Sequence, residues 1–258
     1  MKIKNIFTLS LAILFGQLSF AQNARFATQG IIEYEKKVNM YALIADQIKK
    51  YPDDTFGPKV FEDYKKNNPQ FKLLKSTLTF GKNQTLFTPI PELTSQSGWY
   101  NFNAAQQNNT IFTNTAEQTS IAQKKIYEET YLVKDSTRKI NWKITNEIRN
   151  IAGYDCRRAN AVIMDSIYVV AFYTDEIPVS GGPESFTGLP GMILGVAVPR
   201  EHITWFATGV TDQPVTDDKL KAPVKGKVVD NKKLSDILKE ALKDWGKGAQ
   251  EMLKNFLF

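Results

Sequence analysis

Cysteine and histidine are almost missing from this chain of 258 residues, which contains one of each. With Cys156 alone, no internal disulfide can form, so the hydrophobic core has to stabilise the fold. The thiol itself can be a buried small apolar group, half of an intermolecular bridge or a reactive nucleophile. Because His202 is the only histidine, a histidine-rich metal site is excluded, and we expect neither metal nor organic cofactor.

Catalytic constellations are also missing. No serine lies in a G-x-S-x-G elbow, no glycine-rich phosphate loop is present, and His202 lies at the expected start of a strand rather than beside a nucleophile. Asp165, Asp175 and Glu176 can gather on loops, so a hydrolase that uses carboxylates stays as a less favoured alternative. We therefore predict no enzyme and assign no catalytic residues.

Concentrated charge and long apolar runs are absent from most of the chain. The net charge is +6, and the basic residues are scattered apart from Lys124-Lys125, Arg157-Arg158 and a lysine-rich tail, so we expect no nucleic-acid partner. Beyond the N-terminus no segment is apolar enough to span a membrane. The pattern indicates an exported chain without a membrane anchor.

The first 21 residues have the pattern of a secretory signal. Lys2 and Lys4 precede an apolar run over 6–18, and Ser19-Phe20-Ala21 supplies small residues for a cut after Ala21. The run is shorter than the roughly 20 residues that cross a bilayer, and no cysteine near the cut offers a lipid anchor. We expect residues 1–21 to be removed. The mature protein is then expected in the periplasm of a Gram-negative envelope or outside the cell, with association with the inner face of the outer membrane as a further alternative.

Alternation of apolar and polar residues predicts a mainly β (α+β) domain over 22–212. Residues 30–40 alternate with a period of two, and a turn at 81–84 joins two further strands. Further strands are predicted at 110–114, 118–133, 139–149, 154–164, 166–174, 192–198 and 201–210. Short connections at Asp135-Ser136 and Pro199-Arg200 favour an antiparallel meander, hence a strongly curved antiparallel sheet or half-open barrel.

Two other segments have different patterns. Residues 42–67 show apolar residues at helical spacing, broken by Pro52 and Pro58, which predicts a helical insertion. Residues 89–110 are rich in Pro, Ser, Asn and Gln and predict a long loop.

Residues 213–258 predict a charged connector followed by a C-terminal amphipathic helix. The apolar stripe consists of Leu234, Ile237, Leu238, Leu242 and Trp245, and it continues through Leu253 and Phe256 after glycines at 246 and 248. Asn231 or Ser235 can cap the helix. The stripe can dock on its own sheet, on a partner protein or on a membrane surface, and the pattern leaves these open.

The most specific pattern lies between 142 and 194. Its residues are Trp142, Tyr154, Pro183, Gly188, Leu189, Pro190, Gly191, Met192 and Ile193. Proline followed by glycine in Gly188-Leu189-Pro190-Gly191 is typical of a type II turn, here leading into a buried strand. The loop can fix a corner of the sheet or form a docking or ligand-contacting surface.

This segment resembles the GLPGLI family of exported proteins, best known from the Bacteroidota, with Met192 where leucine is usual. The resemblance implies an envelope protein of largely unknown biochemical function, and some members are encoded beside TonB-dependent outer-membrane transporters. We therefore expect a non-catalytic periplasmic binding or assembly module, an accessory subunit of an outer-membrane protein complex or TonB-dependent transporter. The alternative is a soluble carrier of an apolar ligand or lipoprotein, which a cavity lined by Phe, Leu and Tyr would favour.

Overall fold

The computed structural model describes residues 26–92, 102–245 and 253. Their strands form one sheet of twelve. The strands are β1 (Gly30–Asn39), β2 (Phe71–Gly81), β3 (Gln84–Pro89), β4 (Asn109–Asn114), β5 (Thr119–Ile126), β6 (Glu129–Ser136), β7 (Lys143–Ile151), β8 (Tyr154–Ile163), β9 (Ile167–Thr174), β10 (Met192–Val198), β11 (Ile203–Asp212) and β12 (Lys227–Val229). The helices are α2 (Met40–Lys50), α3 (Gly57–Asn67) and α4 (Asn231–Ala241), with 3-10 turns η2 (Asn103–Ala105), η3 (Pro199–Glu201) and η4 (Asp217–Leu220). The mainly β prediction is confirmed.

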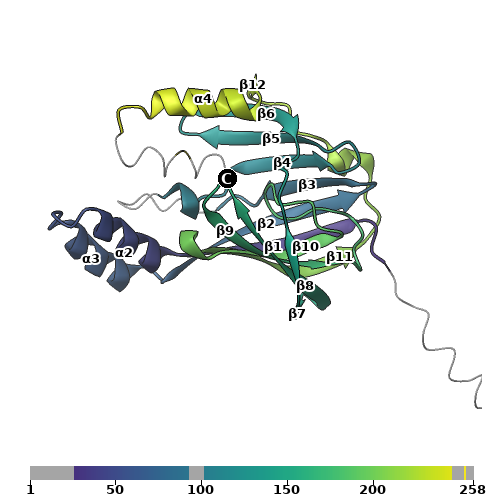
Figure 1. Ribbon diagram of the computed structural model, residues 1–258, viewed down its shortest axis with the longest axis horizontal. Coiled ribbons are helices and arrows are strands. Elements are labelled where there is room, and N and C mark those ends of the chain that lie inside the picture. The colour runs from purple at the N-terminus through teal and green to yellow at the C-terminus, as the bar shows by residue number, and fades with distance from the viewer. Residues whose placement is uncertain (1–25, 93–101, 246–252, 254–258) are drawn as a thin grey trace, which may run out of the picture.

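The sheet consists of two meanders joined by the first strand. The order is β12-β6-β5-β4-β3-β2-β1-β11-β10-β9-β8-β7, so β1 lies between the end of one meander and the end of the other. All neighbours are antiparallel except β12, which pairs parallel with β6. At one end the sheet rolls up, because β7 contacts β11 although three strands separate them in the order (Figure 1).

Two details of the predicted meander were wrong. The expected single strand over 118–133 is a hairpin of β5 and β6, turned at Tyr127, whose φ is +54°. Asp135-Ser136 is not a hairpin connection, because β6 runs through both residues and the next strand, β7, lies at the opposite end of the sheet. Short polar segments mark a turn in the sequence, but they carry no information on which strand the chain joins next.

The alternation of buried and exposed residues along the strands determines which side chains form the core. In β1 every second residue is buried, and Ile32, Tyr34 and Val38 point into the concave side of the sheet. The predicted turn at 81–84 is confirmed, with Lys82 and Asn83 both at positive φ, as a tight hairpin between β2 and β3 needs. Within the described residues, no helix has the length and apolar character that crossing a bilayer requires.

The helical insertion is confirmed as α2 and α3, which pack on each other and extend beyond the sheet at its lower left in Figure 1. Asn39 begins α2 by accepting a hydrogen bond from the backbone N–H of Ala42 at 3.1 Å. One side-chain contact ties α2 to the η3 turn, since His202 Nε2 lies 2.8 Å from Asp46 Oδ2. This hydrogen bond lowers the pKa of the Asp46 carboxyl.

The terminal helix docks on its own domain. Leu234, Leu238 and Leu242 are buried, and α4 lies against β6. Ile237 is partly buried against the same core, whereas Trp245 is 56% exposed. The cap is neither Asn231 nor Ser235 but Asp230, whose carboxylate accepts from the Lys233 N–H at 2.6 Å. Apart from Leu253, the predicted stripe beyond residue 245 lies outside the described residues.

The burial of Leu238 against the sheet predicts that this side chain stabilises the fold. Replacing Leu238 with alanine leaves a cavity between α4 and the sheet, so we expect the free energy of unfolding to fall by about 2–4 kcal/mol in urea denaturation. Trp245→Ala is the control in the turn that follows α4, and it should change stability by less than about 1 kcal/mol because the ring is exposed. Equal losses in both variants would contradict this docking.

Candidate binding site beneath the β9–β10 loop

The chain between β9 and β10, residues 175–191, crosses the concave side of the sheet and is fixed there by backbone hydrogen bonds. Met192 N donates to Ile177 O at 3.0 Å, and Ile193 N donates to Gly181 O at 2.8 Å. The apolar side chains of this loop are buried in the core, namely Ile177, Val179, Phe186 and Leu189. The loop is therefore a packed part of the core rather than a surface excursion.

The turn in the Gly188–Met192 region differs from the expected one. Gly191 N donates to Leu189 O at 2.8 Å, which closes a three-residue turn around Pro190. Gly191 has φ +155°, not the value near +80° that a type II turn needs, so that prediction was wrong. The reason is tertiary, because Gly191 passes so close to Thr174 that a Cβ would lie 2.1 Å from its carbonyl oxygen.

The other residues singled out from the sequence hold this loop in place. Trp142 Nε1 donates to Thr187 O at 2.9 Å, and its ring lies beside Gly188. Tyr154 and Trp142 are half-buried against the core, while Pro183, Met192 and Ile193 are buried. Only Gly188 and Pro190 of the motif are exposed. The arrangement supports the corner-fixing role that the sequence left open.

One charged residue of the loop points into the protein. Glu184 is 7% exposed and has φ +53°, a left-handed conformation that costs a residue with a Cβ about 1 kcal/mol. Its Oε2 accepts a hydrogen bond from Asn109 Nδ2 on β4 at 3.0 Å. Strained backbone beside a buried charge is a feature that clusters at functional sites.

A lysine of β1 lies in the same region. Lys36 is 4% exposed, and its Nζ donates to Gln106 O at 2.6 Å and lies 4.9 Å from the centre of the Trp205 ring. Lys36 and Trp205 are directly paired residues of β1 and β11. The ammonium is thus held by a carbonyl and an aromatic face.

A second buried lysine interacts electrostatically with Glu184. Lys124 of β5 is 6% exposed and is paired with Asn109 of β4, the residue that binds Glu184. Burial lowers the pKa of Lys36 and of Lys124 to about 8, an effect that Glu184 opposes in both. Burial raises the pKa of Glu184, and both lysines act against that rise. The three side chains form one electrostatic unit.

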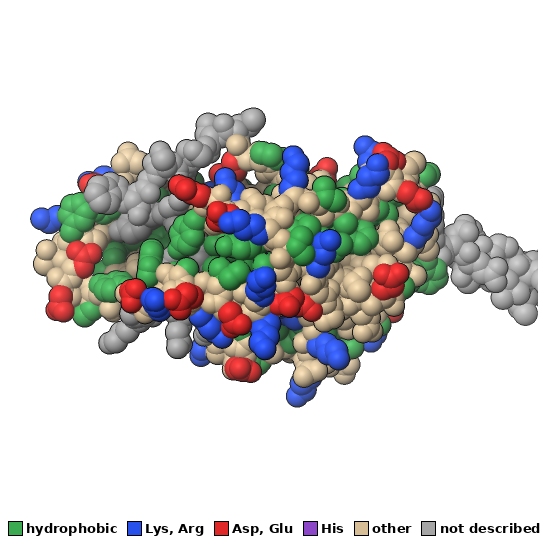
Figure 2. Space-filling model, turned by 90° about the horizontal axis from the view of Figure 1, so that it is seen from above, with side chains coloured by type: hydrophobic (Ala, Val, Ile, Leu, Met, Phe, Trp, Pro, Cys, Tyr) green, Lys and Arg blue, Asp and Glu red, His purple; other side chains and the backbone are tan. Residues whose placement is uncertain are grey.

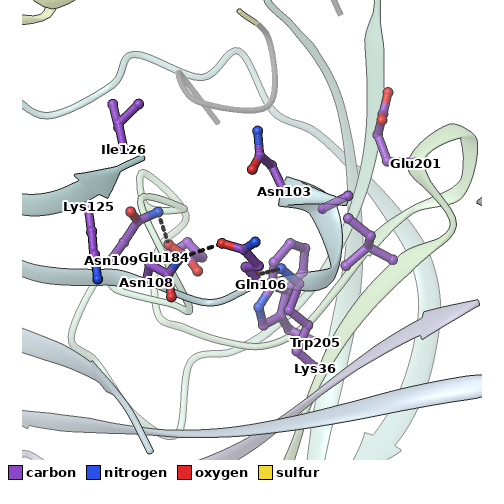
Figure 3. A pocket seen from close by; sticks show the side chains of 12 residues that line it. Lys36, Asn103, Gln106, Asn108, Asn109, Lys125, Ile126, Glu184, Glu201 and Trp205 are labelled. Atoms are coloured by element: carbon purple, nitrogen blue, oxygen red, sulfur yellow. Dashed lines mark hydrogen bonds between the residues drawn. The ribbon is translucent and has the colours of Figure 1, made fainter. Parts of the chain in front are cut away.

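Above Lys36 and Glu184 a cavity of about 70 Å³ opens to the surface (Figure 3). It is lined by residues of both meanders and the loop: Lys36, Asn103, Ala104, Gln106, Asn108, Asn109, Lys125, Ile126, Glu184, Glu201, Ile203 and Trp205. Figure 2 shows that charged side chains of both signs are interspersed over the upper face of the molecule. We call this hollow the Lys36–Glu184 cavity.

Sequence reasoning missed this site, although a signal was present. Strand alternation places Lys36 on the same face as the apolar Tyr34 and Val38, and places Lys124 with Ala122 and Ile126. A charged residue at an inward strand position is almost never buried without a charged or polar partner. The partner, Glu184, follows Lys36 by more than a hundred residues and could not be identified from spacing.

The other reactive side chains considered from the sequence lie outside the cavity. Cys156 is fully buried, and burial raises the pKa of its thiol to about 12, so it is the inert apolar group among the three alternatives. Asp165, Asp175 and Glu176 are exposed and do not line the cavity. In the described part of the chain, no three His, Cys, Asp or Glu side chains gather as a metal site would need. The cavity supplies charge and hydrogen bonds.

The buried lysines predict an unusual pH dependence of stability. Between pH 8 and 10.5 the unfolded chain holds protons on Lys36 and Lys124 that the folded chain has released, so stability should rise with pH in this window. We expect the free energy of unfolding to increase from pH 7.5 to 9.5, by at most about 1.4 kcal/mol per pH unit for each lysine. Urea denaturation of the wild type and of Lys36→Met measures it, and the variant should show the smaller slope. A flat or falling profile would contradict the assignment.

Comparison with known proteins gives one short family match and one likeness in fold. Residues 161–195 match a family described as a protein of unknown function, Porph_ging, and this segment contains Glu184 and the 188–193 motif. No curated protein sequence is significantly similar to the chain. In fold, the chain is similar to PNGF-II in two crystal forms, with TM-scores of 0.50 and 0.51 and identities of 18% and 15%. The matches cover 82% and 81% of this chain but 33% and 32% of PNGF-II, so it spans about a third of that protein's length.

Proposed function

We propose that this chain is an exported, non-catalytic binding module of a Gram-negative envelope, and that the Lys36–Glu184 cavity is its binding site. The observation that carries the proposal is the pair of buried opposite charges at the base of a cavity that opens to the surface. Buried charges cost free energy unless they are paired and hydrogen-bonded, so their presence at the base of an open cavity supports a role in binding. The cavity is also formed in part by the loop that carries the family resemblance.

The setting of the module follows from the sequence pattern. Residues 1–21 have the composition of a signal peptide, and the GLPGLI resemblance associates such chains with outer-membrane transporters. We therefore propose an accessory subunit that accompanies an outer-membrane protein complex or TonB-dependent transporter.

The alternative of an apolar-ligand carrier has less support. The Lys36–Glu184 cavity is lined by lysines, glutamates and amide side chains rather than by Phe, Leu and Tyr. An apolar ligand there would desolvate Lys36 and Glu184 further without offering hydrogen bonds in return.

Co-purification tests the proposed association. The tagged protein is extracted from native envelopes in mild detergent, and the proteins that co-purify are quantified by mass spectrometry. The wild type is compared with a double variant of the cavity rim, Asn108→Arg combined with Lys125→Glu, which we call the rim variant. We expect one outer-membrane protein in stoichiometric amount with the wild type and at least about a tenfold loss with the rim variant. Lys134→Glu, an exposed lysine of β6 outside the cavity, is the matched control. Recovery of the chain alone in every preparation would overturn the subunit role.

Export has an independent test. The intact mass of the protein purified from its native host should correspond to a chain that begins at Gln22. A protein that keeps residues 1–21 and fractionates with the cytoplasm would refute the envelope location.

A further inference from the structure

The charges around the Lys36–Glu184 cavity alternate in sign. Lys125 and Glu184 lie on one side, Lys36 lies over Trp205 at the base, and Glu201 lies across from them (Figure 3). Two lysines and two glutamates make the lining formally neutral. A neutral lining with separated charges discriminates against a ligand that carries a single charge, because such a ligand meets a like charge as well as an opposite one.

The two inner charges keep hydrogen-bonding capacity. An ammonium group has three donors, and Lys36 uses one on Gln106 O at 2.6 Å. A carboxylate accepts through two oxygens, and Glu184 receives the Asn109 amide on Oε2. Each group can therefore form a further charge-assisted bond to a ligand.

The rest of the lining fits a small organic body. Asn103, Gln106 and Asn108 contribute amide side chains, and Asn108 Nδ2 donates to Gln106 Oε1 at 2.6 Å. Ile126, Ile203 and Trp205 supply apolar surface. Fixed polar groups beside a smaller apolar surface can orient a small ligand and bury its apolar part.

We propose that the cavity binds a small zwitterion of the amino-acid class, with the ammonium group of the ligand facing the glutamates and its carboxylate facing the lysines. This inference rests on the proposed binding role, and it adds a small ligand inside the cavity to the protein partner that contacts its rim. The neutral lining matches a neutral dipolar ligand, and the apolar wall accommodates an aliphatic side chain. The small size of the cavity favours a ligand of the size of a single amino acid.

Calorimetric titration of the purified mature chain tests the ligand class. The probe is L-leucine. L-leucine methyl ester is the analogue that lacks the carboxylate, and 4-methylpentanoate is the analogue that lacks the ammonium group. We expect saturable binding of leucine and about ten- to hundredfold weaker binding of each analogue, since each loses one charge-assisted bond. Equal affinity for 4-methylpentanoate would identify an anion site, and equal affinity for the ester would identify a cation site; either result overturns the zwitterion.

Variants locate the binding and separate the two proposals. Lys125→Gln and Glu201→Gln should each weaken leucine binding about tenfold or more at unchanged melting temperature, whereas Lys134→Gln should not. If none of the twenty amino acids binds at a concentration of about 10 mM, the inference fails, because a dissociation constant above that value is too weak for specific recognition. Recovery of the outer-membrane partner with the wild type would then leave the proposed function intact, so the two failures are distinguishable.

Discussion

Gly191→Ala is expected to abolish stable folding, because an added Cβ would approach backbone atoms more closely here than at any other glycine of the described residues. A Cβ at this position would lie 2.1 Å from the Thr174 carbonyl oxygen, 2.8 Å from its carbon and 3.0 Å from Asp175 Cα. All three are backbone atoms, so no side-chain rotation relieves the overlap. The end of β9 would have to separate from the start of β10, and we expect a loss of more than about 4 kcal/mol in the free energy of unfolding.

A second glycine provides the control. Gly209 lies in β11, and a Cβ there meets no heavy atom within 4 Å, so Gly209→Ala should change stability by less than about 0.5 kcal/mol. Circular dichroism during urea denaturation measures both variants. A Gly191→Ala protein that unfolds at the same urea concentration as Gly209→Ala would refute the close approach of the loop to Thr174.

Glu184→Gln is the second prediction, and it tests the buried charges. Glutamine has the volume of glutamate and can still accept the Asn109 hydrogen bond, but it removes the negative charge that faces Lys36 and Lys124. Removing one partner of a buried charge cluster leaves the other charges uncompensated, which costs about 3–5 kcal/mol. We expect a loss of that order at pH 7, measured as the free energy of unfolding in urea.

Two further variants make the result specific. In Glu184→Gln combined with Lys36→Met, one uncompensated ammonium is gone, so part of the lost stability should return. Glu129→Gln is the surface control, because Glu129 pairs with Lys227 at 2.7 Å with both side chains exposed, and its loss should cost less than about 1 kcal/mol. Equal effects of Glu184→Gln and Glu129→Gln would show that the buried cluster carries no special electrostatic role.

Together the two predictions separate two roles of the same loop. Gly191 fixes where the loop enters β10, and Glu184 positions a charge beneath it. The glycine acts through sterics and should be insensitive to pH. The glutamate acts through charge and should depend on pH together with the two lysines.

Local patterns in the sequence determined the secondary structure. Alternation in β1, helical spacing in α2 and α3, and the apolar stripe of α4 each involve residues a few positions apart, whose side chains share a face because of backbone geometry alone. The same alternation places Lys36 on the inward face. The sequence by itself therefore determined a mainly β chain with a helical insertion and an amphipathic terminal helix.

The tertiary structure alone decided how these elements meet. It placed β1 between β2 and β11, separated β6 from β7 by the width of the sheet, and brought Glu184 within electrostatic reach of Lys36 and Lys124. It also decided that α4 covers β6 and that a γ-turn, rather than a type II turn, leads into β10. These contacts join residues dozens to more than a hundred positions apart. Their formation depends on how the whole core packs, and no local periodicity records that.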